Sequence, residues 1–475
     1  MEGRVRYRLT MRGIISWGTY LPFRRLDRTT IASVAGSGGG KGTRTVASYD
    51  EDTTTLGVEA ARVALRDCPD APPLSLWFAT ADPAYLDKTN AAAVHAALRL
   101  DSAVPAYDAL GSIRSALGAL RAALDSSSTS LVVTADRRGS LPGSPDESAG
   151  GDGASSVLIG DDAIDAPVLA EIVAWESLTE EFLDRWRTPG DPRSRQWEER
   201  FGETRYTDLG ARAIAALLRT TGLAVDAIDH LIVVGPHDRA NTAVAKKSGV
   251  ASDRVVDALG AVVGNTGAAA PLLVLASVLE RALPGQRILL LVLADGADAV
   301  LLRTTPAISQ HKASRPTSEQ ISAGAPVAYG KYLAWRGLLP VEPPRRPEPA
   351  RPSSSAASRN TEGKFGFVGS EDEDGVVHLP PADGDWSMRP MSEVLGTIVT
   401  FTIDRLAYSQ SPPVVFAVVD FDGGGRLPVE LTDVDPEDVA IGGRVEMTFR
   451  KLFTADGIHN YFWKARPVRV NGVEG

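Results

Sequence analysis

Two distant stretches of this chain carry nearly the same text, and that repetition constrains the fold more than any other feature. Residues 107–112 read YDALGS and residues 256–261 read VDALGA, and each stretch leads into a segment rich in alanine, leucine and glycine. A short apolar run follows each segment, LVVTAD at 131–136 and LLVLAD at 290–295. The repeated order of helix and buried strand predicts that the chain contains one α/β unit twice.

A second pair of segments extends the repeat. A predicted helix at 53–65 precedes an apolar strand at 75–80, and a predicted helix at 206–218 precedes an apolar strand at 230–235. Each pair lies upstream of its copy of the first repeat. The duplication therefore covers most of the chain up to about residue 300.

An aromatic and charged insert at 178–204 interrupts the repeat. It contains Trp186, Arg187, Trp197 and Phe201. Segments between structural units lie on the surface, where binding residues concentrate. We expect this insert to form a wall of a substrate site.

The second copy contains a polar turn, Gly264-Asn265-Thr266-Gly267, which opens into an apolar helix predicted from Thr266 onward. Small residues at the start of this helix allow close approach to its first turn. The first N–H groups of a helix have no partner within the helix and can donate to a ligand. The turn is therefore predicted to face a functional site.

Composition excludes several classes of function. The 475 residues carry a formal net charge of -10, which argues against a protein that binds nucleic acid. The longest apolar runs are too short to span a bilayer, so we expect a cytoplasmic protein without a membrane segment. The single cysteine, Cys68, allows no internal disulfide and no metal site built from several thiolates.

Residues 33–48 form a glycine-rich stretch that we expect to be mobile. Within it, residues 37–43 read SGGGKGT, which resembles a phosphate-binding loop. No strand pattern precedes this loop and the spacing G-x-x-x-x-G-K-S/T is not met. The sequence therefore does not predict a nucleotide site here.

The character of the sequence changes after residue 305. Residues 306–366 include a run rich in proline and arginine followed by serines, a composition that cannot bury a core and predicts a linker. Short runs of β-forming residues, separated by Gly and Asp turns, then follow and predict a small β-barrel. The predicted domains are 12–165 and 166–305 for the two halves, 306–366 for the linker and 367–470 for the barrel domain.

Two polar residues follow predicted buried strands. His237 comes after the strand at 230–235, and Asn265 lies on the turn after the next unit. Ligands of α/β folds bind at the carboxyl ends of the strands, so the duplication predicts that both residues reach the same sheet edge. The same symmetry places residues 110–112 at the start of the facing helix. Three loops are therefore expected to meet at one cavity.

Several short motifs resemble one family. They are GIISWGTYLP at 13–22, DEDT at 50–53, Pro236-His237, VAKK at 244–247 and GNT at 264–266. Over residues 12–305 the chain resembles archaeal-type hydroxymethylglutaryl-CoA synthases of the thiolase superfamily. A second set of motifs resembles the OB-fold proteins that accompany thiolase-like enzymes: RGLLP at 336–340, FVGS at 367–370 and VVHLPP at 376–381. The resemblance implies an α/β chain with a duplicated thiolase-like α/β/α/β/α layered fold and a C-terminal OB-like β-barrel.

The resemblance also implies roles for individual residues. In that family a cysteine at the start of the first repeat's central helix is acylated, a histidine and an asparagine polarise the thioester oxygen, and a glutamate moves the proton. His237, Asn265 and Glu51 match the last three roles. Lys246 and Lys247 are the residues expected to bind coenzyme A.

No cysteine stands at the position of the nucleophile, because residues 109–114 read ALGSIR. Leu110, Gly111 or Ser112 occupies that position. Ser112 would be a nucleophile only with a base in reach, and a serine at a helix start also serves as a cap. The family's zinc ribbon is missing too, since residues 369–375 read GSEDEDG, so no metal site is expected.

The predicted function is carbon–carbon bond chemistry on an acyl-CoA, such as a non-covalent aldol or retro-aldol step on a β-hydroxyacyl-CoA. Two alternatives remain: a non-catalytic subunit that binds acyl-CoA or scaffolds a complex, and a serine-dependent acyltransferase. We expect coenzyme A thioester as the substrate and no tightly bound cofactor. A homodimer is expected, with a thiolase-like protein as a further partner. The sequence names neither the acyl chain nor the pathway.

Overall fold

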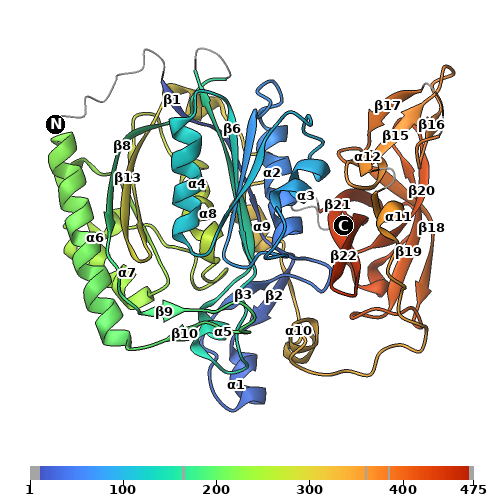
Figure 1. Ribbon diagram of the computed structural model, residues 1–475, viewed down its shortest axis with the longest axis horizontal. Helices are drawn as coiled ribbons and strands as arrows, with labels where there is room; N and C mark the ends of the chain where they lie inside the picture. The colour runs from blue at the N-terminus through green and yellow to red at the C-terminus, as the bar shows by residue number, and fades with distance from the viewer. Residues whose placement is uncertain (1–10, 163–165, 359–360, 383, 385, 470–475) are drawn as a thin grey trace.

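The computed structural model describes residues 11–162, 166–358, 361–382, 384 and 386–469. Two α/β halves come first, and a barrel follows (Figure 1). The first half contains β1 (Arg12–Tyr20), β2 (Arg24–Asp27), α1 (Thr29–Ala35), β3 (Thr43–Val46), α2 (Thr53–Arg66), β4 (Ser75–Thr80), α3 (Ala91–Ala97), β5 (Ala106–Leu110), α4 (Arg114–Asp125), β6 (Ser130–Asp136), α5 (Pro145–Ala149) and β7 (Gly153–Asp161). The second half contains β8 (Ala170–Thr179), β9 (Arg185–Trp186), β10 (Arg195–Gln196), α6 (Glu199–Thr221), β11 (His230–Val234), α7 (Asp238–Lys247), α8 (Ala270–Leu279), β12 (Arg287–Leu293) and β13 (Gly296–Thr304).

The strands of the two halves join in one mixed sheet. Its order is β11-β12-β13-β8-β1-β7-β6-β4-β5. The junction between the halves is narrow, because β1 pairs with β8 only through Gly13 with Glu171 and Ile14 with Ala170. Within each half, parallel pairs such as β4 with β6 and β11 with β12 are flanked by antiparallel strands.

Helices cover both faces of each half and make five layers (Figure 1). Strand β12 shows how the layers arise, because its alternate side chains point to opposite faces. Ile288, Leu290 and Val292 pack toward α4 and α8 in the middle, whereas Leu289 and Leu291 pack toward α6 and α7 outside. Every residue of α8 is buried, as expected of a helix in a central layer. The layered α/β architecture that the family resemblance implied is confirmed.

The two copies of the repeated text differ in structure. The first copy forms the edge strand β5, whereas residues 257–260 of the second copy form a loop. The helix predicted from Thr266 starts later: a 3-10 turn, Gly267–Ala269, comes first, and α8 begins at Ala270. Gly267 has a φ of 57°, in the left-handed region, so a right-handed helix cannot include it.

The remaining elements lead to the barrel and form it. They are α9 (Thr317–Ser322), β14 (Ala325–Pro326), α10 (Tyr329–Trp335), α11 (Ser354–Ser358), α12 (Thr361–Lys364), β15 (Val368–Glu371), β16 (Val377–His378), β17 (Ser387–Pro390), β18 (Gly396–Asp404), β19 (Val414–Phe421), β20 (Arg426–Leu431), β21 (Arg444–Ala455) and β22 (Ile458–Pro467). The barrel closes in the order β18-β19-β20-β22-β21, which confirms the predicted C-terminal barrel. In the part of the chain that the structure describes, no helix is both long and apolar enough to cross a bilayer.

Part of the predicted linker packs against the first half. Strand β14 pairs with β2, and the α10 side chains Tyr329, Tyr332 and Trp335 are buried. These aromatic residues bury apolar area that the proline-rich composition of the region obscures. The exposed, extended part starts after α10, at about residue 339. The residue bounds of the four predicted segments stay a prediction.

Candidate functional site

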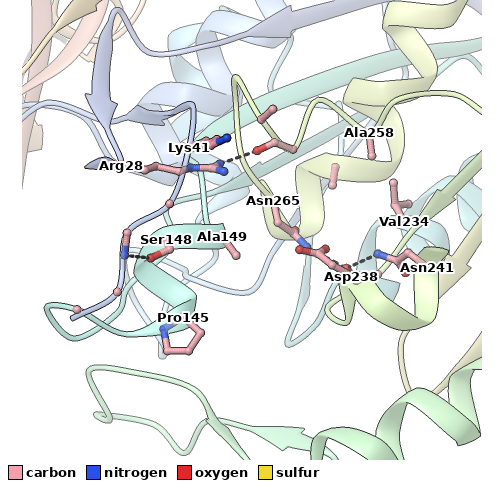
Figure 2. A pocket seen from close by; sticks show the side chains of 18 residues that line it. Arg28, Lys41, Pro145, Ser148, Ala149, Val234, Asp238, Asn241, Ala258 and Asn265 are labelled. Carbon is pink, nitrogen blue, oxygen red and sulfur yellow. Dashed lines mark hydrogen bonds between the residues drawn. The ribbon is translucent and has the colours of Figure 1, made fainter. Parts of the chain in front are cut away.

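A cavity of about 790 Å³ opens at the end of β11, beside the turn that carries Asn265. We call it the Asn265 pocket (Figure 2). Loops from both halves of the duplication form its walls. Its lining residues are Arg28, Gly38, Gly39, Gly40, Lys41, Gly143, Pro145, Ser148, Ala149, Val234, Gly235, Asp238, Asn241, Ala258, Gly260, Ala261, Asn265 and Ala270.

Two cations line the Asn265 pocket. Arg28 is 9% exposed and donates from Nη2 to the Gly260 carbonyl at 2.6 Å, but its Nε has no hydrogen-bond partner among the described residues. Lys41 is exposed and makes no ion pair with any described residue. Asp238 is the only carboxylate among the described lining residues, and burial raises its pKa. With two cations and one carboxylate among its described lining residues, the pocket has an excess of positive charge and is suited to an anion.

The glycine-rich loop forms one wall of this pocket, which the sequence did not predict. Gly38, Gly39 and Gly40 have φ values of 79°, 85° and 140°, which favour glycine. The Gly39 N–H donates to Ser148 Oγ at 2.7 Å and so fixes the loop against α5. The stretch 33–48 was expected to be mobile, yet it includes the buried strand β3. The run of glycines before Lys41 is the feature of the sequence that could have indicated a pocket wall here.

Asn265 is held in place by its own neighbours. Its Nδ2 donates to the Gly235 carbonyl at 2.9 Å, and its Oδ1 accepts from the Gly267 N–H at 3.0 Å. Asn241 donates to the same Gly235 carbonyl at 3.3 Å, whereas its buried Oδ1 has no partner among the described residues. Asn265 has one further N–H that a ligand could accept.

The free N–H groups expected at this helix start are occupied by the chain itself. The Ala268 N–H donates to Asp136 Oδ2 at 2.7 Å, and Thr80 and Ala81 donate to Asp136 Oδ1. Burial raises the pKa of Asp136 although Arg138 lowers it. The Ala268 N–H at the helix start therefore binds an internal carboxylate, whereas Asn265 and Ala270 on either side of it line the Asn265 pocket.

His237 does not line the Asn265 pocket. It is the N-cap of α7: Nδ1 accepts from the Ala240 N–H at 3.3 Å, so Nε2 carries the proton and donates to the Glu199 carbonyl at 2.9 Å. His237 is 5% exposed, and its chain neighbours Gly235 and Asp238 line the pocket although His237 itself does not. The predicted joint site of His237 and Asn265 is not assembled in this structure.

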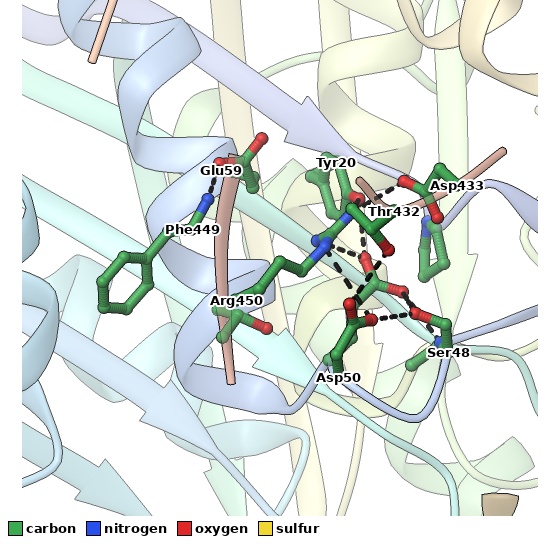
Figure 3. Close-up of polar contacts among 12 residues, drawn as sticks. Tyr20, Ser48, Asp50, Glu59, Thr432, Asp433, Phe449 and Arg450 are labelled. Atoms are coloured by element: carbon green, nitrogen blue, oxygen red, sulfur yellow. Dashed lines mark hydrogen bonds and ion pairs between the residues drawn. The ribbon is translucent and has the colours of Figure 1, made fainter. Parts of the chain in front are cut away.

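Glu51 is buried and binds Arg450 of the barrel, so it lies at the contact between the first half and the barrel. Figure 3 shows Tyr20, Ser48, Asp50 and Arg450 at this contact. Its Oε1 accepts from Tyr20 Oη and Arg450 Nη1, both at 2.6 Å, and its Oε2 accepts from the Ser48 N–H at 2.8 Å. Burial raises the pKa of Glu51 to about 7; Arg450 opposes this shift, and Asp433 and Asp50 add to it. Glu51 lines neither the Asn265 pocket nor the pocket of Ser112, so the structure does not bring it to the other predicted residues.

We call Glu51 and the polar and charged residues around it the Glu51 cluster: Tyr20, Ser48, Asp50, Glu51, Thr432, Asp433, Arg450 and Lys464. Asp50 shows how the cluster works. Burial raises its pKa, but Lys464 at 3.0 Å and Arg450 lower the pKa to about 2. These contacts join the first half to the barrel and are structural.

Ser112 lies in a second cavity, of about 460 Å³, which we call the insert pocket because residues 185–191 of the insert line it. The Ser112 Oγ accepts from the Arg114 N–H at 3.2 Å, a local contact two residues along the chain in the turn before α4. Among the described lining residues there is no histidine to act as its base. Leu110 and Gly111 line the same pocket, and the position of the missing cysteine is therefore in the insert pocket whichever of the three residues occupies it.

Lys246 and Lys247 form the last turn of α7 and line neither pocket. Cations at this end of a helix interact favourably with its dipole, which accounts for them. Arg28 and Lys41, not chosen from the sequence, are the cations at the Asn265 pocket. In the described residues no group of three His, Cys, Asp or Glu side chains could hold a metal ion, and the expected lack of zinc stays a prediction.

Comparison with known proteins relates both parts of the chain to characterised families. Residues 218–303 match the 3-oxoacyl-[acyl-carrier-protein] synthase III C-terminal family, and residues 389–450 match the family of the C-terminal OB-fold domain of ChsH2. The hydroxymethylglutaryl-CoA synthase of Aeropyrum pernix is 31% identical over 346 residues, 69% of this chain and 95% of that protein. The same enzyme of Thermococcus sibiricus is 27% identical over 337 residues, 68% of this chain and 96% of that protein.

A solved structure agrees with these sequence matches. MvaS in complex with 3-hydroxy-3-methylglutaryl coenzyme A superposes with a TM-score of 0.59 at 19% identity, covering 74% of this chain and 96% of that one. This likeness concerns the fold. The sequence identity over the length of the archaeal enzymes, together with the duplicated fold and the barrel, shows that the chain belongs to the hydroxymethylglutaryl-CoA synthase family of the thiolase superfamily and carries a C-terminal OB-fold domain of the ChsH2 type.

Proposed function

We propose that this protein binds an acyl-CoA thioester in the Asn265 pocket without transferring the acyl group to one of its own side chains. The observation that carries the proposal is the composition of this pocket. Two cations with little neutralisation, Arg28 and Lys41, lie beside an asparagine amide, and no cysteine, serine-base pair or histidine lines the pocket among the described residues. Of the three readings of the sequence, this favours the acyl-CoA-binding subunit.

The chemistry of coenzyme A fits such a pocket. Its phosphates are anions that Arg28, Lys41 and the N–H groups of the glycine-rich loop could bind. The thioester carbonyl could accept a hydrogen bond from the remaining N–H of the Asn265 amide. Val234 and Ala258 offer apolar contacts to the arm that carries the thioester. Relatives named as hydroxymethylglutaryl-CoA synthases support coenzyme A thioesters as the ligand class.

Calorimetric titration of the full chain with coenzyme A and acetyl-CoA tests this proposal. Arg28→Ala and Lys41→Ala should each weaken binding about tenfold, the range of one charge-assisted hydrogen bond. Lys246→Ala and Lys247→Ala, in cations outside the pocket, are the matched controls and should change affinity less than twofold. Equal losses in both pairs of variants would contradict the assignment of the ligand to the Asn265 pocket.

Intact-protein mass after incubation with acetyl-CoA tests the non-covalent part. We expect no added acyl mass. An acetyl adduct that disappears in Ser112→Ala would establish the serine-dependent alternative instead.

A second candidate function is the retro-aldol cleavage of a β-hydroxyacyl-CoA. Asp295 favours it, because this carboxyl lines the insert pocket with Ser112 and Tyr206, where a base could reach a bound ligand, and burial and Glu181 raise its pKa. Turnover of a β-hydroxyacyl-CoA that is lost in Asp295→Asn would support it. Binding without turnover would leave the first proposal.

A homodimer is proposed for the assembly. Strand β5 is an edge of the main sheet, and Tyr107 on it is 47% exposed and stacks on Trp77 at 4.9 Å. An unpaired edge can add a strand from a second copy. Light scattering that gives the mass of one chain at all concentrations would rule the homodimer out. A thiolase-like partner protein would be found instead by co-purification.

A further inference from the structure

We propose that a cavity between the first half and the barrel binds a phosphate group, held by Arg315 and Arg469. The cavity measures about 170 Å³, and we call it the junction pocket. It shares no lining residue with the Asn265 pocket or the insert pocket, so this inference does not depend on the proposed function. The observations that carry it are the few partners of these two arginines and their place on one cavity.

Several parts of the chain meet at the junction pocket. The end of β1 contributes Tyr20, the segment before α9 contributes Arg315, and the barrel domain contributes Asp433 and Arg469. Tyr20 and Asp433 also belong to the Glu51 cluster, so the pocket adjoins the contact that Figure 3 shows. Pockets for drug-sized ligands measure about 300–1,000 Å³, so this one suits a small ligand. Such a ligand would contact the first half and the barrel at once.

Arg315 is only partly neutralised. Its one ion pair among the described residues is with Glu446 Oε1 at 3.3 Å, and the same oxygen accepts from Arg466 Nε at 2.7 Å. Burial lowers the pKa of Arg315 and the nearby Arg466 adds to this, whereas Glu446 and Glu59 oppose it. A guanidinium has five N–H groups, so Arg315 keeps most of its donors for a ligand.

Arg469 makes no ion pair with any described residue. Its Nη2 donates to the Asp433 backbone carbonyl, and its Cζ lies 3.4 Å from the centre of the Phe23 ring. These contacts fix the guanidinium without placing a carboxylate against it. Burial lowers the pKa of Arg469 to about 10 although Asp433 opposes this, and Arg466 and Arg315 lower it further. An anion that touches both Arg315 and Arg469 would relieve the repulsion between them.

The other two arginines that line the pocket are paired more completely. Arg66 donates from Nε and Nη2 to Glu393 Oε2. Arg466 donates from Nη2 to Glu59 at 2.9 Å and from Nε to Glu446 at 2.7 Å. These two guanidinium groups are therefore held by the protein itself.

Three carboxylates line the pocket. Asp433 binds Arg450 at 2.7 Å, and Glu446 is shared between two arginines. Glu319 is exposed and makes no ion pair with a described residue. Apart from the shared Glu446, none of them forms an ion pair with Arg315 or Arg469 in the part of the chain that the structure describes.

A phosphate group matches what remains unpaired. It carries a charge of about -1.5 to -2 near neutral pH and three or more acceptor oxygens, and a guanidinium presents its N–H groups in a planar fork that fits them. Ser314 also lines the pocket, and its hydroxyl donates to no described residue. The group comes either from free phosphate or from a phosphate monoester on a larger ligand. In both cases it joins the segment before α9 to the barrel domain.

Equilibrium dialysis of the full chain with radiolabelled inorganic phosphate tests the inference. Arg315→Gln and Arg469→Gln should each weaken binding about tenfold, the range of one charge-assisted hydrogen bond. Arg426→Gln, in an exposed barrel arginine paired with Asp420, is the control and should change the affinity less than twofold. Arg28→Ala, in the Asn265 pocket, should also leave it unchanged.

A gain of affinity gives a second test that breaks no ion pair. Glu319→Gln removes an exposed carboxylate from the lining and should tighten phosphate binding about twofold. This variant decides the question if an arginine variant does not fold, and an unchanged affinity in it would then overturn the inference.

The remaining outcomes are as clear. No binding to the unmodified chain would overturn the inference, and so would an affinity that survives in both arginine variants. Binding that is lost in Arg28→Ala would place the anion in the Asn265 pocket and overturn it as well. Competition in Arg28→Ala identifies the source of the group: displacement of the label by coenzyme A indicates a monoester, and displacement by unlabelled phosphate alone indicates the free ion. Both of these results support the site.

Discussion

The Glu51 cluster and the Asn265 pocket both bury charged groups, but they pair them differently. Both carboxylate oxygens of Glu51 accept hydrogen bonds from side chains or backbone of the same protein. In the Asn265 pocket the Arg28 Nε and the Asn241 Oδ1 have no partner among the described residues. Buried polar groups that serve the fold are normally paired internally, so unpaired groups at a cavity indicate a place for a ligand. Arg450 Nε in the Glu51 cluster also lacks a hydrogen-bond partner among the described residues, but it lies 3.9 Å from Asp50 Oδ1, and Arg450 lines none of the three pockets. An open cavity beside the unpaired atom, more than the missing partner alone, distinguishes the candidate binding groups.

The largest effect should come from breaking the Glu51 cluster. Arg450→Leu removes the cation that contacts Glu51 at 2.6 Å and Asp433 at 2.7 Å, and it leaves both carboxylates buried. We expect a loss of about 3–5 kcal/mol in the free energy of unfolding, measured by urea denaturation. Arg426→Leu, in an exposed barrel arginine paired with Asp420, is the control and should cost less than about 1 kcal/mol. Equal losses would mean that the cluster does not stabilise the docked barrel.

A smaller effect is expected from the titration of Glu51. Its pKa is raised in the folded chain from the ordinary 4.5 to about 7, so between these values the folded chain holds a proton that the unfolded chain has released. Stability must then fall as the pH rises from 4.5 to 7, by up to about 3 kcal/mol. Asp50 has a lowered pKa and contributes below this window. Glu51→Gln should remove this loss of stability between pH 4.5 and 7. Urea denaturation of the unmodified chain and the variant at several pH values would measure it. An unchanged loss in the variant would mean that other groups cause it.

Asn265 sharpens the comparison on the side of the pocket. Asn265→Ala removes two local hydrogen bonds and should cost about 1–2 kcal/mol of stability. It should also weaken acetyl-CoA binding about tenfold if the amide donates to the thioester. Thermal melts and calorimetric titration measure the two effects. Lost stability with unchanged affinity would make Asn265 structural, like Glu51.

The smallest effect is expected at His237. Because its ring caps α7, His237→Ala should cost about 1 kcal/mol of stability and leave the affinity for acetyl-CoA unchanged. In the double variant with Asn265→Ala the effects on affinity should add, since the two side chains share no contact among the described hydrogen bonds. A non-additive effect on affinity in the double variant would support the joint site of His237 and Asn265 that the sequence predicts.

The sequence predicted the fold well because the repeat and the apolar runs are local. The strands β6 and β12 and the helix α2 lie close to where periodicity and repetition placed them, whereas α6 begins at Glu199, seven residues before its predicted start at 206 and inside the predicted insert. The candidate site was predicted less well, because its geometry depends on distant contacts. His237 does follow a buried strand, but the Glu199 carbonyl that accepts a hydrogen bond from its ring lies in the first turn of α6, which begins within the insert. The sequence alone does not distinguish Arg28 from the other arginines, because its position at the pocket depends on contacts made in the folded chain.

Glu51 shows the same limit most clearly. Its motif matched the family, yet its role in this chain follows from Arg450, which the barrel supplies. The glycine-rich loop is the opposite case. Its motif was incomplete as a nucleotide loop, although its glycines and Lys41 do line a cavity. A local pattern can indicate that residues are special, but the contacts made across the fold decide in what respect.

The partners in the Glu51 cluster are also synthesised at different times. Glu51 and Arg450 are separated by 399 positions, so at about 5–20 residues per second a ribosome needs about 20–80 s to make the second after the first. During this interval the first half has a carboxylate, and Asp50 beside it, whose cations do not yet exist. These carboxylates therefore have to stay hydrated in the nascent chain until the barrel is synthesised. The barrel then supplies the cations that allow them to be buried.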